Sequence, residues 1–374
     1  MAKYRVGLVG ANRGSGLVYP FSVFPETEIM ALCDLNEKRL AEAGQYYKVP
    51  DKYLYTDYEQ FLGGPVDVVV VGTPIQVHAG QVVKALEAGK HVLSEVTAAW
   101  TIEQCEQIVN AVKRSKKVYM IAENNCYMEY IREWKRWIDA GRLGDIFYAE
   151  AEYIHDIQDL LIDETSREAL WRLERPPIYY CSHSIGPLLL LMHDRIVKAT
   201  GAHSGYGIMP DQGIGCLNME VGLFKTQKGA VIKILRSQVA KRELPLHYYS
   251  LYGTKGCVEN GRRGDSHDRT GLLYVEEEHG KYLDRNLQIR YGGLVTIDTP
   301  RADTLAPKEA FGGGHGTVEY YLVRDFIDTL NSGAVRPPIN DVIRAMDMTV
   351  PGICAHEAAM SADGKWVDVP LFGW

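Results

Sequence analysis

The chain has 374 residues, of which 46% are hydrophobic, and its formal net charge at pH 7 is −7. This length is enough for a large core and favours two domains over one. The acidic balance argues against a nucleic-acid partner, which would bind a basic face, and no apolar run approaches the length of a membrane span. Because the first predicted strand begins at Arg5, no room is left for a signal peptide, and we expect a cytoplasmic protein.

The first 34 residues predict half of a dinucleotide-binding βαβ unit. A strand at 5–9 leads into a glycine-bearing turn at 10–16 and a helix, and a second strand at 28–33 stops at Asp34. Small residues let the backbone approach a pyrophosphate, and the helix offers it unpaired N–H groups. An acid at this place binds the ribose diol and repels a 2′-phosphate, which favours NAD over NADP. The expected cofactor contacts here are Gly10, Asn12, Arg13, Gly14 and Asp34.

Further cofactor candidates stand at or near the carboxyl ends of the next strands, where open α/β sheets bind ligands. The apolar run at 66–71 predicts a strand buried on both faces of a parallel sheet, and a second strand covers 90–94. Glu95, at the tip of that strand, either caps the following helix or contacts the ribose or substrate. A strand at 118–122 brings the first domain to a close. The candidates in this part are Thr73, Pro74, His78, Glu95 and Asn124.

The remainder of the chain predicts a second domain, so the expected boundaries are 1–124 and 125–374. It begins with a helix through Trp134 and Trp137 and ends with helices near 317–331 and 341–359. Strands are expected at 146–154, 197–202, 216–224, 231–236 and 248–253. Residues 260–310 are predicted to form loops between short strands. Alternation along the first of these strands places Tyr153 and His155 on one side.

Three short motifs occur in order in the first domain. They are G-T-P-x-x-x-H from Gly72 to His78, G-K-H-V from Gly89 to Val92, and the acid Glu95. Together they resemble the Gfo/Idh/MocA family of NAD(P)-dependent sugar and cyclitol oxidoreductases. The resemblance implies an α/β protein with a Rossmann domain followed by an α/β domain on a mostly antiparallel, open-faced sheet. Dehydrogenases of that family usually follow the acid with Lys and Pro, whereas this chain continues with Val and Thr.

A narrower resemblance rests on longer motifs. These are Glu95–Ala99, Glu123–Tyr127, Glu152–Asp156, Tyr180–Pro187 and Gly313–Gly316. They are similar to motifs of the NAD-dependent glycoside hydrolases typified by α-N-acetylgalactosaminidase. The mechanism that this resemblance implies oxidises C3 of the sugar transiently, removes the C2 proton, expels the leaving group and adds water, so that NAD is unchanged overall.

This narrower resemblance also implies residue roles. Tyr153 is the base at the carbon next to the ketone, with His155 beside it, while Tyr180 and His183 handle the hydroxyl that becomes the carbonyl. The substrate-binding candidates are Glu123, Arg172 and His315. A tyrosine ordinarily titrates at about 10, so the base role requires that its phenolate be favoured. The nicotinamide cation or a nearby histidine could do this.

A structural interpretation of the same residues has to be weighed. A tyrosine on a strand is by default a packing residue, and a histidine that begins an apolar helix is often a cap or a satisfied core group. The four catalytic candidates at matching positions favour the enzyme. Family dehydrogenases usually carry an Asp about four residues before the histidine equivalent to His183, and residues 178–187 contain no acid. Zinc ligands have tighter spacing than His155, Asp156 and His183, so no metal site is expected.

Two other functions remain open at this point. One is a conventional NAD-dependent dehydrogenase of a sugar or cyclitol, including one that forms a 3-keto sugar, and the other is a non-catalytic sugar or nucleotide sensor. The expected partner is a small carbohydrate or glycoside, with no nucleic acid and no membrane. An open sheet face is rarely left to water, so a homodimer or homotetramer is also expected.

Overall fold

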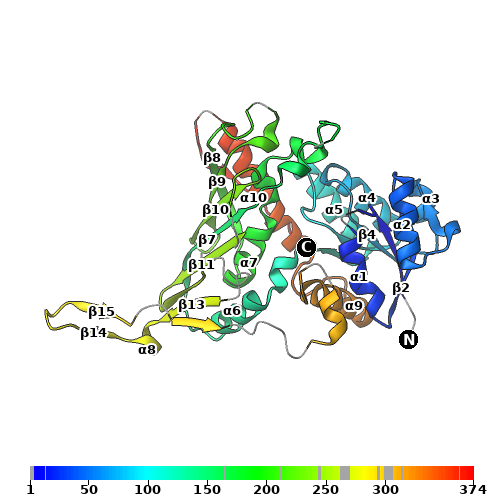
Figure 1. The fold of residues 1–374 in the computed structure, drawn as a ribbon. Coiled ribbons are helices and arrows are strands. Elements are labelled where there is room, and N and C mark those ends of the chain that lie inside the picture. Colours follow the sequence, from blue (N-terminus) through cyan, green and yellow to red (C-terminus); the bar gives the residue numbers. More distant parts are fainter. Residues whose placement is uncertain are drawn as a thin grey trace. The chain divides into compact units, whose positions relative to one another are not determined.

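The computed structural model describes residues 4–12, 14–163, 165–210, 212–242, 246–261, 270–292, 295–298, 306–312, 315–361 and 363–374. The chain divides into two compact units (Figure 1). The first comprises Met1–Tyr127, Leu305–Met346 and Phe372–Trp374, and the second comprises Met128–Thr304 and Asp347–Leu371. Across the described ranges, no helix combines the length and the apolar character needed to cross a membrane.

The first unit is built on a parallel sheet with the strand order β3-β2-β1-β4-β5-β6. Its strands are β1 (Tyr4–Val9), β2 (Thr27–Cys33), β3 (Leu54–Tyr55), β4 (Val68–Val71), β5 (His91–Ser94) and β6 (Tyr119–Ile121). Its helices are α1 (Ser15–Val23), α2 (Glu37–Tyr47), α3 (Tyr58–Leu62), α4 (Ile75–Glu87), α5 (Ile102–Ser115) and α9 (Val318–Ser332), with short 3₁₀ turns η1 (Asp51–Tyr53), η2 (Asn124–Tyr127) and η7 (Lys308–Gly312).

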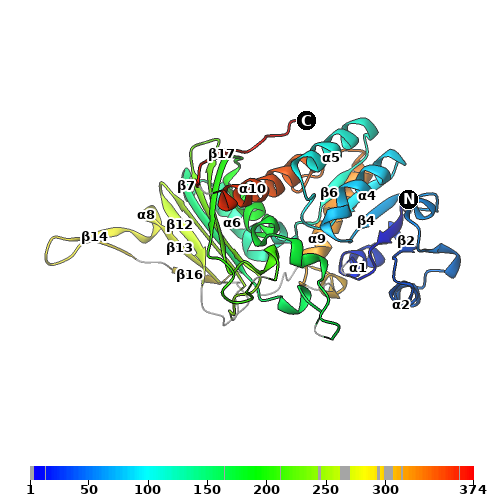
Figure 2. The same ribbon diagram turned by 90° about the horizontal axis from the view of Figure 1, so that it is seen from above.

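Burial explains why β4 forms the middle of this sheet. All four of its valines are fully buried, as expected for a strand covered on both faces. Helices α4 and α5 lie side by side on one face and α1 lies on the other (Figure 2). Right-handed crossovers that run in opposite directions from β1 and β4 produce this arrangement. The predicted Rossmann-type α/β organisation of the first domain is therefore confirmed.

The expected second domain, residues 125–374, includes a later segment that groups with the first unit. Helix α9 packs on α1, where the rings of Phe21 and Phe326 meet edge to face with centroids 6.1 Å apart. The backbone N–H of Ile121 on β6 donates to the carbonyl oxygen of Asn340 at 3.1 Å. An edge strand has unpaired backbone groups, and this segment pairs one of them. Residues 305–346 therefore belong with the first unit, not with the second.

The second unit is built on a mixed sheet with the order β16-β13-β12-β11-β7-β10-β9-β8-β17. Its strands are β7 (Ile146–Ile154), β8 (Ile196–His203), β9 (Glu220–Thr226), β10 (Val231–Ser237), β11 (His247–Gly253), β12 (Gly256–Asn260), β13 (Thr270–Val275), β16 (Val295–Asp298) and β17 (Val367–Asp368). Each neighbouring pair is antiparallel except β7 and β10, which confirms the mostly antiparallel sheet. A hairpin of β14 (Lys281–Leu283) and β15 (Ile289–Tyr291) projects from its β13 end (Figure 1).

Helices cover one face of this sheet (Figures 1 and 2). They are α6 (Glu129–Asp139), α7 (Ser182–Met192) and α10 (Val342–Met360), of which the residues from Asp347 on belong to this unit; α8 (Glu276–His279) follows β13. Alternation on β10 shows the two faces, because Ile232, Ile234 and Arg236 are buried while Val231 and Lys233 are partly exposed. Val231 and Lys233 lie on the opposite face of the sheet, over which the described residues place no helix. We call this the open face.

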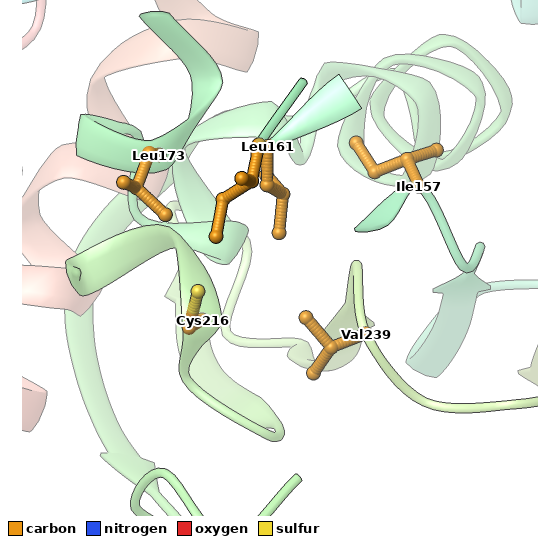
Figure 3. Packing of buried hydrophobic residues seen from close by; sticks show 6 residues of the cluster. Ile157, Leu161, Leu173, Cys216 and Val239 are labelled. Atoms are coloured by element: carbon orange, nitrogen blue, oxygen red, sulfur yellow. The ribbon is translucent and has the colours of Figure 1, made fainter. Parts of the chain in front are cut away.

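The connections before α7 are anchored by a small apolar cluster (Figure 3). Its buried members are Ile157, Leu161, Ile162, Leu173, Cys216 and Val239. Most come from 3₁₀ turns η3 (Gln158–Leu160), η4 (Trp171–Glu174) and η6 (Ile214–Cys216) or from segments beside them, whereas Val239 follows β10. The 3₁₀ turn η5 (Pro177–Tyr180) follows η4. This packing fixes the backbone that carries Arg172 and Arg175.

Candidate active site

The cofactor turn, residues 10–14, follows β1 at the point where the strand order of the first unit reverses. Gly10 has a φ of +90°, and a Cβ there would lie 2.6 Å from the carbonyl carbon of Gly72. A Cβ on Gly14 would lie 2.7 Å from the carbonyl oxygen of Gly10. The turn can therefore close only with glycine at these two positions. It leaves bare backbone beside the first turn of α1, whose N-cap residue Gly14 has no side chain to satisfy the helix N–H groups.

Asp34 stands directly after β2 and is tied to the cofactor turn. Its Oδ2 accepts a hydrogen bond from the backbone N–H of Ala11 at 2.7 Å, and its Oδ1 accepts one from Asn36 at 2.8 Å. The carboxylate is thus fixed beside the turn, as a ribose diol requires. Asn12 is exposed on the same turn, and Arg13 lies outside the described residues. The arrangement fits NAD, with the turn and α1 beside the pyrophosphate and Asp34 beside the ribose.

His78 connects two loops of the first unit. Its Nε2 lies 2.6 Å from the carbonyl oxygen of Thr73 and its Nδ1 lies 3.0 Å from that of Thr97. Burial lowers the pKa of this fully buried imidazole, so the neutral form is favoured. His78 therefore holds the loop after β4, where Pro74 is the N-cap of α4, instead of presenting a free ring nitrogen. Glu95 is buried after β5, and its Oε2 accepts from the N–H of Val96 at 3.1 Å.

Asn124 and His315 come together within the first unit, and they share a third residue. Asn124 Nδ2 lies 3.3 Å from His315 Nδ1 and donates to Glu319 Oε1 at 3.4 Å, and His315 pairs with the same carboxylate. Burial opposes ionisation of Glu319, but the hydrogen bond and charge of His315 lower its pKa on balance. Among the described residues, the buried Oδ1 of Asn124 has no hydrogen-bond partner. Sequence reasoning missed Glu319, although an acid four residues after His315 on a helix is a detectable pattern.

The structure brings the four catalytic candidates together in the second unit. The hydroxyl of Tyr153, at the end of β7, lies 2.9 Å from His155 Nδ1. Its ring centroid is 6.3 Å from that of Tyr180 and 5.5 Å from that of His183, while Tyr180 and His183 are 5.0 Å apart. His247 on β11 stacks on Tyr153 at 4.1 Å, and sequence reasoning missed it. We call these five residues the tyrosine–histidine cluster.

Two buried arginines adjoin this cluster and were also missed. Burial, followed by the charge of Arg236, lowers the pKa of the half-buried His155, so its neutral imidazole is favoured. Arg236 alternates with Ile232 and Ile234 on the buried face of β10, and a charged residue in that pattern is the signal that could have revealed it. Arg175 follows η4 and is buried as well.

The other substrate candidates occupy different places. Arg172 is half-buried, with its guanidinium carbon 4.4 Å from the ring centroid of Trp171 in η4. Glu123 is fully buried in the first unit, where its Oε1 accepts from the N–H of Asn125 at 3.1 Å. His315 is partly exposed beside Glu319. Among the described residues, no group of three or more His, Cys, Asp or Glu side chains has the arrangement of a metal site.

The chain is similar in sequence and in fold to several known proteins. A glycosyl hydrolase family 109 protein of Streptomyces niveus is 27% identical, with 98% of this chain and 77% of the relative covered. An α-N-acetylgalactosaminidase of Shewanella oneidensis is 25% identical, with 89% of this chain and 78% of the relative covered. A solved structure of levoglucosan dehydrogenase with NADH and L-sorbose superposes with a TM-score of 0.81 at 21% identity, over all of both chains, and shows the shared fold.

A match to a family model covers most of the first unit. Residues 4–123 match the model of the Gfo/Idh/MocA family, described as an oxidoreductase family with an NAD-binding Rossmann fold. The matched range contains the cofactor turn, Asp34 and every strand from β1 to β6. Residues 4–123 are therefore an NAD-binding Rossmann domain that is similar to that of the Gfo/Idh/MocA oxidoreductases.

Proposed function

We propose that this protein is an NAD-dependent enzyme that acts on a carbohydrate and cleaves glycosides without net oxidation or reduction. The observation that carries the proposal is the hydrogen bond between Tyr153 and His155 inside a cluster that also contains Tyr180 and His183. The relatives named as glycosyl hydrolases and as an α-N-acetylgalactosaminidase support the same reaction class.

The cluster is suited to proton abstraction next to a carbonyl. When bound, NAD supplies reversible two-electron oxidation of a secondary alcohol. Tyr153 is then the base that takes the proton from the neighbouring carbon, after its own proton has passed to His155 Nδ1 at 2.9 Å. Burial and Arg236 lower the pKa of His155, so its imidazole is neutral in the resting protein, and its Nδ1 lies within reach of that proton. Loss of the carbon-bound proton expels the leaving group, and water then adds to the unsaturated ketone. The hydride removed in the first step returns to the ketone carbon, so the alcohol is restored.

Other residues have binding roles in this proposal. Tyr180 and His183 hold the hydroxyl that becomes the carbonyl, and their rings lie 5.0 Å apart. Arg172, Glu123 and His315 bind the substrate. His78, whose two ring nitrogens contact backbone carbonyls, shapes the cofactor loop by positioning Thr73. We also propose that a homodimer or homotetramer forms through the open face of the second unit, where Leu223 and Tyr252 are more than a third exposed.

The experiment that tests the proposed function is a screen of aryl glycosides with the purified protein and no added cofactor. We expect release of the aryl alcohol through many turnovers without accumulation of NADH. Silence in this screen, together with stoichiometric NADH from a free sugar once NAD is supplied, would show a dehydrogenase instead. Sugar binding without either signal would show a sensor. Light scattering of the same sample gives the oligomeric state, and a monomer would contradict the interface.

A further inference from the structure

Two buried arginine side chains face the tyrosine rings of the tyrosine–histidine cluster. The guanidinium carbon of Arg236 lies 4.3 Å from the ring centroid of Tyr153 and 5.9 Å from that of Tyr180. The guanidinium carbon of Arg175 lies 4.2 Å from the ring centroid of Tyr180. Both arginines are at most 2% exposed, so solvent and salt screen their charges little. Each phenol ring thus has a cation against it.

Neither arginine has a carboxylate partner in the described part of the chain. Arg236 Nη1 donates to the carbonyl oxygens of Tyr153, at 3.0 Å, and Ser237, while Arg175 Nη2 donates to Gln238 Oε1 at 2.7 Å. The Nε of each has no hydrogen-bond partner among the described residues. Buried charges in proteins are normally paired, since an unpaired one is costly. Two adjacent buried cations with neutral partners therefore require an explanation.

No nearby acid forms an ion pair with either arginine among the described residues, and the charge of Glu220 favours the Arg236 cation less than the charges of Tyr153 and Tyr180 do. The other titratable or charged groups near the two rings and the two arginines are His155, Asp156, Asp159, Arg172, Cys181, His183, Glu220 and His247. Glu220 accepts from His356 Nδ1 at 2.6 Å and from the N–H of Ile178 at 2.8 Å, and Asp156 pairs with Lys241. Asp159 is exposed. The groups that can become anionic directly against the guanidinium planes are the two phenols.

We infer that Arg236, assisted by Arg175, is a positioning residue that holds Tyr153 as a phenolate, and the inference rests on the base role proposed for Tyr153. A positive charge within about 4–6 Å of an acid favours its ionised form by about 1–3 pKa units. The departing proton passes from the Tyr153 hydroxyl to His155 Nδ1 and then to solvent, which leaves the phenolate oxygen free to take the carbon-bound proton. Tyr180 lies near both arginines, so their charges favour its ionised form as well.

The titration behaviour of the arginines agrees with this geometry. Burial and the charge of Arg236 lower the pKa of Arg175 to about 9, and burial lowers the pKa of Arg236. The cation of each is therefore destabilised in its pocket as long as the phenols are neutral. Ionisation of Tyr153 or Tyr180 stabilises them, since the tyrosine charges act in the opposite direction on both arginine pKa values.

The test is a titration of tyrosine by NMR on the purified protein without substrate, with ¹³C at Cζ. The chain has 23 tyrosines, so Tyr153→Phe and Tyr180→Phe assign the two signals by their loss. We expect the Tyr153 midpoint to lie about 1–3 units below the ordinary value of about 10. Arg236→Gln should raise that midpoint by about one unit or more, while Arg236→Lys should retain part of the shift because it keeps the charge.

The matched control is Arg142→Gln. Arg142 also places its guanidinium over an aromatic ring, 5.4 Å from the centroid of Trp137, and pairs with Glu278. The Arg142→Gln variant should leave the titration midpoint of Tyr153 unchanged. The difference between Arg236→Gln and Arg142→Gln isolates the effect of the arginine that faces Tyr153.

A Tyr153 midpoint at or above about 10 in the wild type would overturn the inference, even if Arg236→Gln does not fold. The inference would also be overturned if folded Arg236→Gln kept the wild-type midpoint of Tyr153. The same holds if Arg236→Lys raised that midpoint as much as Arg236→Gln does. Because no substrate is used, this result is separate from the proposed function. A low titration midpoint of Tyr153 in a protein that cleaves no glycoside would support the phenolate and contradict the proposed glycosidase function. Glycosidase activity together with an ordinary midpoint would support the proposed function and contradict the phenolate.

Discussion

The cofactor turn and the tyrosine–histidine cluster are built in opposite ways. In the turn, position is set by backbone and by the absence of side chains, since a Cβ at Gly10 or Gly14 would collide with neighbouring backbone. In the cluster, side chains from β7, η5, α7 and β11 converge, with buried arginine charges behind them. The first kind of site should fail when atoms are added. The second should fail when a proton or a charge is removed.

The largest effect is expected from Tyr153→Phe, which removes a hydroxyl and leaves the ring in place. Because a positioned base contributes about 10²–10⁴-fold, kcat/KM for an aryl glycoside should fall by about a thousandfold. The matched control is Tyr148→Phe on the same strand but on the open face, where the hydroxyl bonds Glu150. Steady-state rates of both variants check this. Equal losses in the two would show that the cluster has no special chemical role.

A second test adds one carbon to the cofactor turn. Gly10→Ala forces a side chain into a φ of +90° and into the backbone of Gly72, so it should lower the free energy of unfolding by more than about 1–2 kcal/mol and weaken NAD binding. Gly80→Ala is the control, since a Cβ added at this exposed position in α4 would meet nothing within 4 Å apart from the helix backbone, and helix propensity should add up to about 1 kcal/mol. Thermal unfolding and NAD titration measure both. Similar behaviour of the two variants would contradict the backbone-built turn.

Asp34→Ala probes a side chain that holds the turn. The carboxylate accepts from Ala11 and Asn36, and its loss removes both bonds and the ribose acceptor. Charged hydrogen bonds contribute about 1.5–3 kcal/mol, so the Kd for NAD should rise by about 10–100-fold. Discrimination against NADP should decrease at the same time. Isothermal titration with both nucleotides measures this, and an unchanged preference would place the ribose elsewhere.

The smallest effect concerns pH and the stability of the first unit. His91 Nδ1 accepts from the N–H of Val118 at 3.0 Å, and burial, followed by the charge of Lys117, lowers its pKa from 6.5 to about 4. The unfolded chain binds a proton at His91 more readily than the folded chain does. The stability that neutral His91 contributes to the fold is therefore complete above pH 6.5 and is lost as the pH falls towards 4. His91→Asn keeps an acceptor without titrating. Its Tm should fall less than the wild-type Tm over that range, and parallel curves would refute the assignment.

The same contrast explains what the sequence could reveal. The turn, Asp34 and the strand at 66–71 are local patterns, because the spacing of glycines, an acid and buried valines is written in consecutive residues. Tyr153, His155, Tyr180 and His183 were found by their motifs. The return of residues 305–346 depends on contacts such as Ile121 with Asn340, which no local pattern contains. The roles of Arg236 and His247 depend on strand register, which places both beside Tyr153.

The most direct test of the glycosidase mechanism follows hydrogen at the carbon next to the oxidised centre. An aryl glycoside that the protein cleaves is incubated with it in deuterated water, and the released sugar is examined by NMR. Abstraction by Tyr153 with exchange through His155 predicts deuterium at C2 of the product, at the same rate as release of the aryl alcohol. Cleavage that leaves C2 with its original hydrogen would show direct displacement at the anomeric carbon and would contradict proton abstraction by the cluster.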